Sequence, residues 1–192
     1  MKNKVELPPD RLMHPRPTLL VGSNVGGKAN FMAMGGGGVV NAEPPMMGVL
    51  LRHKSYTLKG IWQNKTFSMN TPSVDLVKEA DFCGITSGAD VDKVKACRFK
   101  VFYGHLKTAP LIEQCPINLE CRVVNIMDLG SHDFIIGQVA GTYVSEDCLT
   151  DGKPDVAKIR PIIFDITFRR YFAYGEVIAG AYNAGLELKE RK

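Results

Sequence analysis

The sequence predicts a mainly β fold, a barrel of strands with a few helices at its periphery. Short apolar or alternating segments recur along the chain and are separated by Gly, Pro, Asn and Asp. Helical spacing is confined to two short segments. The chain also has no internal repeat and no alternation of strands with long helices, which argues against a parallel α/β sheet.

Length and composition fit one domain. The 192 residues are 45% hydrophobic and 23% charged, values that exclude disorder, collagen and coiled coil for the chain as a whole. Apolar runs are far shorter than the ~20 residues of a membrane helix, and no secretory leader is visible. We therefore expect a single domain over 1–192, with an extended N-terminal segment at 1–15, and no membrane association.

The distribution of charge and the cysteine content argue against further classes of protein and site for this sequence. The net charge of +4 comes from interspersed residues, without the clustered Lys and Arg of a nucleic-acid tract. The five cysteines include no C-x-x-C pair, so neither a zinc site nor a dithiol centre of that type is expected. Five reduced thiols are typical of a cytoplasmic protein.

In the N-terminal half, apolar runs predict strands at 18–22, 46–53 and 66–69. Between the first two lies a segment rich in Gly, Asn and Met, with four consecutive glycines at 35–38. Such composition predicts a loop over 23–38 whose backbone can approach a ligand closely.

In the C-terminal half, Thr71-Pro72-Ser73 predicts a helix that ends near Gly84. Alternation at 119–126, a turn at 128–131 and a long apolar segment predict a β-hairpin over 118–144. The remaining expected elements are a short helix at 90–96, a strand at 162–168 and a closing helical turn within 175–185.

One segment imitates a nucleotide-binding loop. Residues 22–28 fit G-x-x-x-x-G-K after a strand, but Ala29 stands where Mg²⁺ binding needs Ser or Thr. The glycines at 35–38 also interrupt any helix that should follow. A nucleotide triphosphatase and a Rossmann dinucleotide site are therefore disfavoured. Two interpretations of the segment remain: a surface turn, or a loop whose many hydrogen-bond donors bind a ligand.

Six consecutive residues carry side chains that can be positively charged or that bear a hydroxyl group: Arg52-His53-Lys54-Ser55-Tyr56-Thr57. An isolated phosphate favours such donors. A continuous strand would place Arg52, Lys54 and Tyr56 on one face, so one ligand uses the whole set only if the strand ends near residue 54. A solvated edge strand explains the same residues.

Two single residues, Lys93 and His132, remain as candidates for ligand binding. Lys93 follows the turn Ser87-Gly88-Ala89-Asp90, from which it could reach an anion, or it is a surface residue of a capped helix. His132 lies near the hairpin turn and is structural, solvated or ligand-binding. No carboxylate pair, Ser/His/Asp set or H-E-x-x-H motif is present, which favours chemistry carried by a cofactor.

Taken in order, several segments resemble the flavin reductase-like, FMN-binding split-barrel family, most closely its flavoredoxin branch. The resemblance covers roughly 15–185. It rests on Lys28-Ala29-Asn30-Phe31-Met32-Ala33, Tyr56-Thr57 with Ile61 and Phe67 to Asn70, Cys83-Gly84 with Ser87-Gly88 and Asp92-Lys93, Leu119 to Val124, Gly130-Ser131-His132 with Ile136 to Val139, and Arg160-Pro161-Ile162 with Tyr171 and Gly175-Glu176.

The resemblance implies a six-stranded antiparallel Greek-key split barrel, a homodimer, and one non-covalent FMN per subunit near the interface. Asn30 and its loop neighbours would meet the isoalloxazine, and Thr57 with Arg52 or Tyr56 the phosphate. Phe164 would be an apolar wall. The cofactor-binding residues that it implies are Asn24, Lys28, Ala29, Asn30, Met32, Ala33, Arg52, Tyr56, Thr57, Ser87, Gly88, Lys93, His132 and Phe164.

Two functions share this cofactor. Either NAD(P)H reduces bound FMN, which reduces free flavin or another acceptor, or the protein carries electrons between redox partner proteins. A third hypothesis from another class, a nucleic-acid-binding β-barrel, is disfavoured by the absence of a basic tract. One departure from relatives stands out: Gly36 occupies a position where they often carry Trp, so we expect a less covered flavin face.

Overall fold

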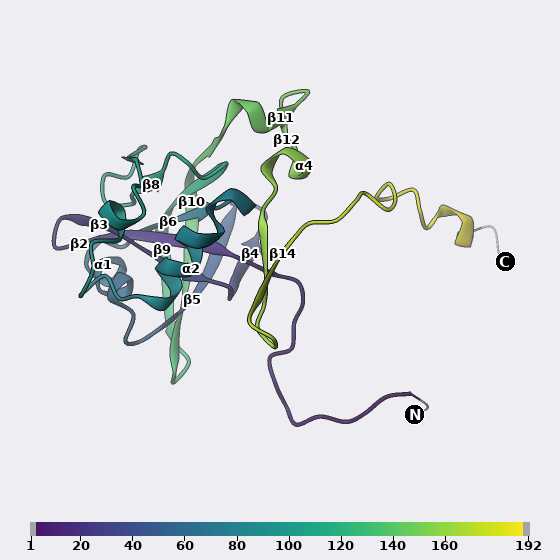
Figure 1. The fold of residues 1–192 in the computed structure, drawn as a ribbon, viewed down its shortest axis with the longest axis horizontal. Coiled ribbons are helices and arrows are strands. Elements are labelled where there is room, and N and C mark those ends of the chain that lie inside the picture. Colours follow the sequence, from purple (N-terminus) through teal and green to yellow (C-terminus); the bar gives the residue numbers. More distant parts are fainter. Residues whose placement is uncertain (1–2, 190–192) are drawn as a thin grey trace.

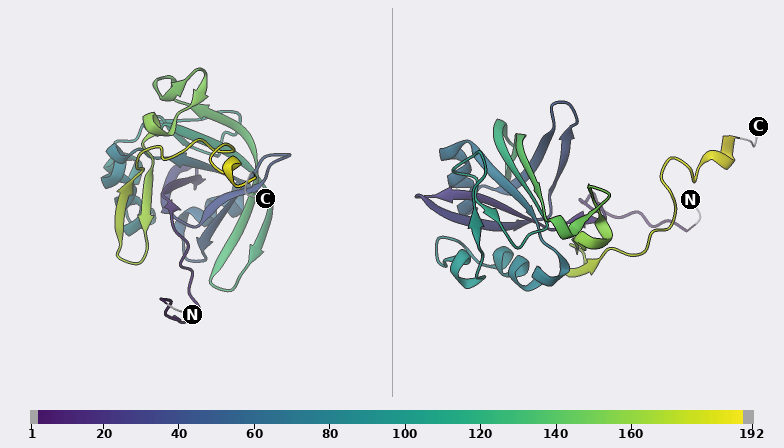
Figure 2. Two further views of the ribbon diagram at one scale, coloured as in Figure 1. Left: turned by 90° about the vertical axis from the view of Figure 1, so that its right-hand side faces the viewer. Right: turned by 90° about the horizontal axis from the view of Figure 1, so that it is seen from above.

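The computed structural model describes residues 3–189 and is built around one curled antiparallel sheet that remains open (Figures 1 and 2). Its seven strands run in the order β3-β2-β6-β9-β10-β5-β4. They are β2 (Leu19–Val25), β3 (Lys28–Met34), β4 (Gly37–Asn41), β5 (Met46–Arg52), β6 (Thr66–Thr71), β9 (Ile117–Asp128) and β10 (His132–Val144). The mainly β split barrel is confirmed; the sheet has a seventh strand, β4.

Smaller elements surround this sheet. The other strands are β1 (Arg16–Pro17), β7 (Val101–Phe102), β8 (Leu111–Ile112), β11 (Leu149–Thr150), β12 (Lys153–Pro154), β13 (Ile162–Asp165) and β14 (Arg170–Ala173). The helices are α1 (Tyr56–Asn64), η1 (Val74–Leu76), α2 (Val77–Ile85), α3 (Lys93–Ala96), η2 (Glu146–Cys148), α4 (Val156–Ile159) and η3 (Leu186–Lys189). Within the described residues, none of the helices has the length and apolar character needed to cross a membrane.

Two apolar clusters hold the molecule together, one on each face of β2 and β3. Leu19, Val21 and Met34 face the barrel interior, where side chains of α1, β5, β6 and β10 join them. Leu20 and Phe31 point the other way, against α2 and the segment around Phe99. Burial on both faces explains why β2 reads as a continuous apolar run.

The expected loop over 23–38 was wrong. β2 and β3 form a hairpin through Gly26 and Gly27, which have φ of +56° and +79°. Glycine adopts this conformation without steric cost, and a two-residue turn of this kind matches the twist of the flanking strands. The glycine run then enters β4, where Gly37 and Gly38 pair with β5. A Cβ on Gly37 would lie 2.6 Å from the Gly48 carbonyl oxygen, so the strands approach too closely for a side chain.

Helix α1 was not predicted from the sequence. β5 ends at Arg52 and α1 starts at Tyr56, so residues 52–57 are a strand end, a turn and a helix start rather than one continuous strand. Gly60 lies against the backbone of β2 at Asn24, where a Cβ would overlap the carbonyl group. The glycine and the initial Tyr-Thr both weaken intrinsic helix propensity, so tertiary packing stabilises this helix.

Other boundaries shift by a few residues. The hairpin over 118–144 and the helix near 71–84 are found as β9–β10 and as η1–α2. The helix expected at 90–96 starts only at Lys93, because Asp92 is its N-cap and accepts from the Lys95 N–H. The strand expected at 162–168 ends at Asp165, whose carboxylate accepts from the N–H groups of a turn leading into β14.

The two ends of the chain extend away from the barrel (Figure 2). Residues 4–13 contain no helix or strand. The closing helical turn expected within 175–185 is found at 181–185, where the Ala184 N–H donates to the Gly180 carbonyl oxygen, and it leads directly into η3. Residues 1, 2 and 190–192, part of the single domain expected over 1–192, lie outside the described residues.

Candidate functional site

A cavity of about 560 Å³ lies beside β3, between the start of α1 and the segment that precedes and forms α3. This volume falls within the range of small-molecule and cofactor sites. The residues that line it are Val25, Lys28, Ala29, Asn30, Tyr56, Gly88, Ala89, Asp90, Val91, Asp92, Lys93, Val94, Val101 and Tyr103.

β3 brings backbone groups to this cavity as well as side chains. It is an edge strand of the seven-stranded sheet and pairs only with β2 among the described strands. Half of the N–H and C=O groups of an edge strand point away from its partner. A planar ligand beside β3 could therefore bond to backbone donors and acceptors, with small Ala29 leaving room for close approach.

Asn30 connects β3 to α1 at the cavity wall. Its side-chain N–H donates to Thr57 Oγ1 over 2.7 Å, and both residues are buried. Gly88 packs against the other side of the Asn30 amide, where a Cβ would overlap Oδ1. Three segments distant in sequence thus meet here, and the glycine is required for that close approach.

Lys93 is a buried cation among the residues that line the cavity. It is 3% exposed, and its Nζ donates to the Cys83 carbonyl oxygen over 2.9 Å. Burial lowers the pKa of Lys93, while the neighbouring thiols Cys83 and Cys97 act in the opposite direction. An ammonium group carries three donors, and within the described residues one of them has a protein acceptor, so donors remain for a ligand.

The N-terminus of α1 adds positive electrostatic potential next to Tyr56. Ser55 is the N-cap residue, but its side chain makes no capping hydrogen bond, and the first turn has no acidic residue. The first N–H groups of a helix lack intrahelical acceptors, and the helix dipole favours an anion there. This is an arrangement that suits a phosphate group.

Six of the implied cofactor-binding residues line the cavity: Lys28, Ala29, Asn30, Tyr56, Gly88 and Lys93. Thr57 is bonded to Asn30 and Ser87 precedes Gly88. Asn24 reaches the lining through Oδ1, which accepts from the Tyr103 hydroxyl over 3.0 Å. Met32 and Ala33, further along β3, pack against the two apolar clusters instead.

Three other implied residues lie outside the cavity lining. Arg52 and His132 face each other across the β5–β10 pair. Burial and the positive charge of Arg52 lower the pKa of His132. Phe164, on β13, packs against Tyr171 and faces Gly35. The assignment of these three to a cofactor stays a prediction, as does that of the lining residues.

Other lining residues were not singled out from the sequence. Tyr103 follows β7 in a stretch without a recognisable pattern, and only the fold brings it to β3. Gly36, which the resemblance suggested as a departure from relatives with Trp, is also outside the lining, and its backbone oxygen accepts from the Leu50 N–H. The segment 22–29 is a hairpin without a following helix, which excludes a phosphate-binding loop of the triphosphatase type.

Comparison with known proteins gives evidence about the protein family that does not depend on the geometry of the cavity. The model of the family described as "Flavin reductase like domain" matches residues 11–160. A flavoredoxin from Methanosarcina acetivorans is 41% identical, with a TM-score of 0.93 over 97% of this chain and 99% of the other. A flavoredoxin from Desulfovibrio vulgaris (Miyazaki F) is 33% identical, with a TM-score of 0.89 over 95% and 99%. An FMN-binding protein from Thermus thermophilus shares the fold at 23% identity, with a TM-score of 0.78 over 94% and 98%.

Proposed function

Because this chain belongs to the flavin reductase-like family, we propose that it binds one FMN non-covalently in the cavity beside β3 and uses it in redox chemistry. In the proposed reaction, hydride passes from NAD(P)H to bound FMN and on to free flavin or another acceptor. The cavity supports this proposal, since it combines an open strand edge, a helix N-terminus and a buried cation.

FMN supplies the hydride-accepting ring, so the protein has to bind and orient it and tune its electrostatics. In our proposal, Asn30 and the edge of β3 bind the ring, and the start of α1 with Tyr56 binds the phosphate. Lys93 would help to hold the ring through a hydrogen bond, and its positive charge would stabilise the negative charge of a reduced flavin.

The observation that carries the proposal is the buried Lys93 with donors left for a ligand. We expect Lys93→Met to weaken FMN binding at least tenfold or to lower the reduction potential of the bound flavin. The matched control is Lys95→Met, since Lys95 is exposed on the same helix. Fluorescence titration with FMN and spectroelectrochemistry measure the two quantities. Equal affinity and equal potential in both variants would remove Lys93 from the site.

A second function is supported by the two flavoredoxin structures, namely electron transfer between redox proteins without NAD(P)H activity. Both functions need the same FMN site. Steady-state oxidation of NADH and NADPH, with and without added free flavin, distinguishes them. Turnover supports the reductase, whereas FMN binding without turnover supports the carrier.

We also propose that the chain acts as a homodimer in the cytoplasm. All five cysteines are free thiols, as a reducing compartment allows. The N- and C-terminal segments leave large apolar side chains in solvent, among them Leu7, Met13, Val177 and Ile178. A second copy of the chain would cover such surface.

A further inference from the structure

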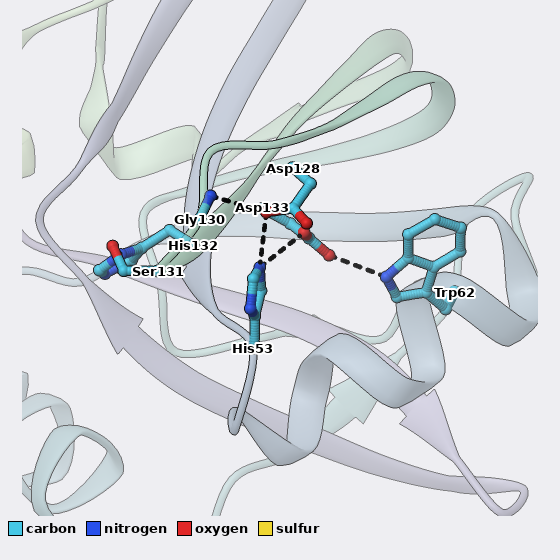
Figure 3. Close-up of polar contacts among 7 residues, drawn as sticks. All are labelled: His53, Trp62, Asp128, Gly130, Ser131, His132 and Asp133. Carbon is cyan, nitrogen blue, oxygen red and sulfur yellow. Dashed lines mark hydrogen bonds and ion pairs between the residues drawn. The ribbon is translucent and has the colours of Figure 1, made fainter.

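A second cluster of potential ligands lies away from the cavity, where the β9–β10 turn meets the connection between β5 and α1 (Figure 3). His53 Nε2 is 3.3 Å from Asp128 Oδ1 and 3.1 Å from Asp133 Oδ1. These three atoms lie within 4.8 Å of one another. The imidazole and the two carboxylates therefore point toward one common space, with the carboxylates on the β9–β10 hairpin and the imidazole on the β5–α1 connection.

Asp133 is the unusual member of this cluster. It is 5% exposed, yet no Lys or Arg among residues 3–189 forms an ion pair with it. Burying a carboxylate is costly unless a positive charge compensates it. Its one ion-pair partner is His53, which is positive only when protonated. Among the described residues, the buried carboxylate therefore has no partner that carries a fixed positive charge.

Trp62 holds the orientation of this carboxylate. Its indole N–H donates to Asp133 Oδ2 over 2.9 Å, which leaves Oδ1 directed toward His53 (Figure 3). On the exposed side, the Gly130 N–H donates to Asp128 Oδ1 over 2.7 Å and fixes the second carboxylate. Hydrogen bonds of this kind to ligating groups are the outer shell that orients metal ligands.

We propose that His53 Nε2, Asp128 Oδ1 and Asp133 Oδ1 bind one divalent transition-metal ion of the zinc type. Two ligand atoms at about 2.0–2.1 Å from a tetrahedral zinc ion are separated by roughly 3.3 Å. The two nitrogen–oxygen distances of 3.1 and 3.3 Å match this separation. The ion replaces the proton of Nε2 and supplies the positive charge that Asp133 lacks.

The ligand set also indicates the class of ion. Three protein ligands, one of them an imidazole nitrogen, suit zinc and its neighbours, with water completing the coordination. Calcium and magnesium favour a larger number of oxygen ligands. A bound ion would link the β5–α1 connection to the β9–β10 turn, and this inference does not depend on the proposed flavin site.

The test is a titration of the chelator-treated, full-length chain with Zn²⁺, Mg²⁺ and Co²⁺. Trp62 is the only tryptophan, so its fluorescence reports on this cluster directly, and calorimetry gives the stoichiometry. We expect one Zn²⁺ with a Kd in the micromolar range, much weaker Mg²⁺ binding, and a higher Tm in the presence of Zn²⁺.

Two variants test the ligands without disturbing the core. Asp128 and His53 are both exposed, so Asp128→Asn and His53→Gln should fold, and each should weaken Zn²⁺ binding at least tenfold. The matched controls are Asp147→Asn and His105→Gln, exposed residues outside the cluster, which should bind as the unmodified chain does. The visible absorption spectrum of bound Co²⁺ should be that of an ion with nitrogen and oxygen ligands.

Three results would overturn the proposal. The first is Zn²⁺ binding weaker than about 1 mM. The second is equal affinity in the unmodified chain and in both ligand variants. The third is an intense sulfur-to-cobalt charge-transfer band, which would place the ion on the cysteines instead.

Discussion

Glu120 is a fully buried carboxylate that organises the loop before β8. It accepts from the backbone N–H groups of His105 and Leu106, over 2.8 and 2.7 Å, and from the Tyr143 hydroxyl over 2.8 Å. Burial alone raises the pKa of Glu120, but these hydrogen bonds outweigh it, and the net pKa lies below the ordinary value. The carboxylate is therefore ionised and stabilising in the folded protein.

We expect Glu120→Gln to lower the free energy of unfolding at pH 7 by about 2 kcal/mol, since charged hydrogen bonds are replaced by weaker ones. A lowered folded-state pKa gives stability that is present above the unfolded-state pKa and is lost as the pH falls through the folded-state pKa. The difference between variant and parent should thus shrink as the pH falls below the ordinary glutamate pKa of about 4.3. Urea unfolding at pH 7 and at a pH below this pKa measures it.

The exposed Glu113 provides the control for this change, because Glu113→Gln removes a carboxylate that is only 3.8 Å from Lys100 Nζ at the surface. We expect a change below about 0.5 kcal/mol there. Equal effects of the two substitutions would mean that the buried hydrogen bonds of Glu120 contribute nothing specific.

Several residues that the family resemblance singled out lie on distant segments of the chain but meet in space, while their role in binding a cofactor stays a prediction. Asn30, Tyr56, Gly88 and Lys93, proposed from their resemblance to a family pattern, do line one cavity. Phe164 was placed beside them, but it lies in a separate sheet with β1 and β14. That sheet forms by a return of the chain to β1, which no local pattern in the sequence specifies.

At the scale of elements, the strands and hairpins with strong periodicity were predictable. The β9–β10 hairpin follows from alternation and its turn residues. β3 and β4 were not predicted, because glycines precede β3, separate the two strands and begin β4, and such composition suggests a loop. The structure explains Gly37 by the close approach of β5, which leaves no room for a side chain there. α1 was missed because contact with β2 selects Gly60 against helix propensity.

Gly137 tests whether close packing within the sheet is required. A Cβ there would overlap the Phe67 ring, whose Cζ would be 2.7 Å away, and would lie 2.9 Å from Cys121 Cβ. We expect Gly137→Ala to lower the free energy of unfolding by about 1–3 kcal/mol through overpacking. Gly38→Ala is the control, since nothing lies within 4 Å of its Cβ. Thermal and urea unfolding of both variants measure the difference; a stable Gly137→Ala would show that Phe67 moves freely.

At the scale of the whole molecule, the terminal segments 3–15 and 172–186 are exposed to solvent. They extend from the barrel (Figure 1). They expose apolar side chains, including Val177, which is 90% exposed, and Ile178, which is 97% exposed. Such surface favours association. We expect light scattering after gel filtration to give twice the chain mass of 21.1 kDa. A mass of one chain at micromolar concentration would contradict the homodimer.

The central claim is that the cavity beside β3 holds FMN. The most direct measurement is the visible spectrum of the purified full-length protein after addition of FMN and removal of the unbound excess, with the released ligand identified by chromatography. We predict a yellow protein with one FMN for each chain and weaker retention of riboflavin, which lacks the phosphate. A colourless protein that releases no flavin would contradict the account.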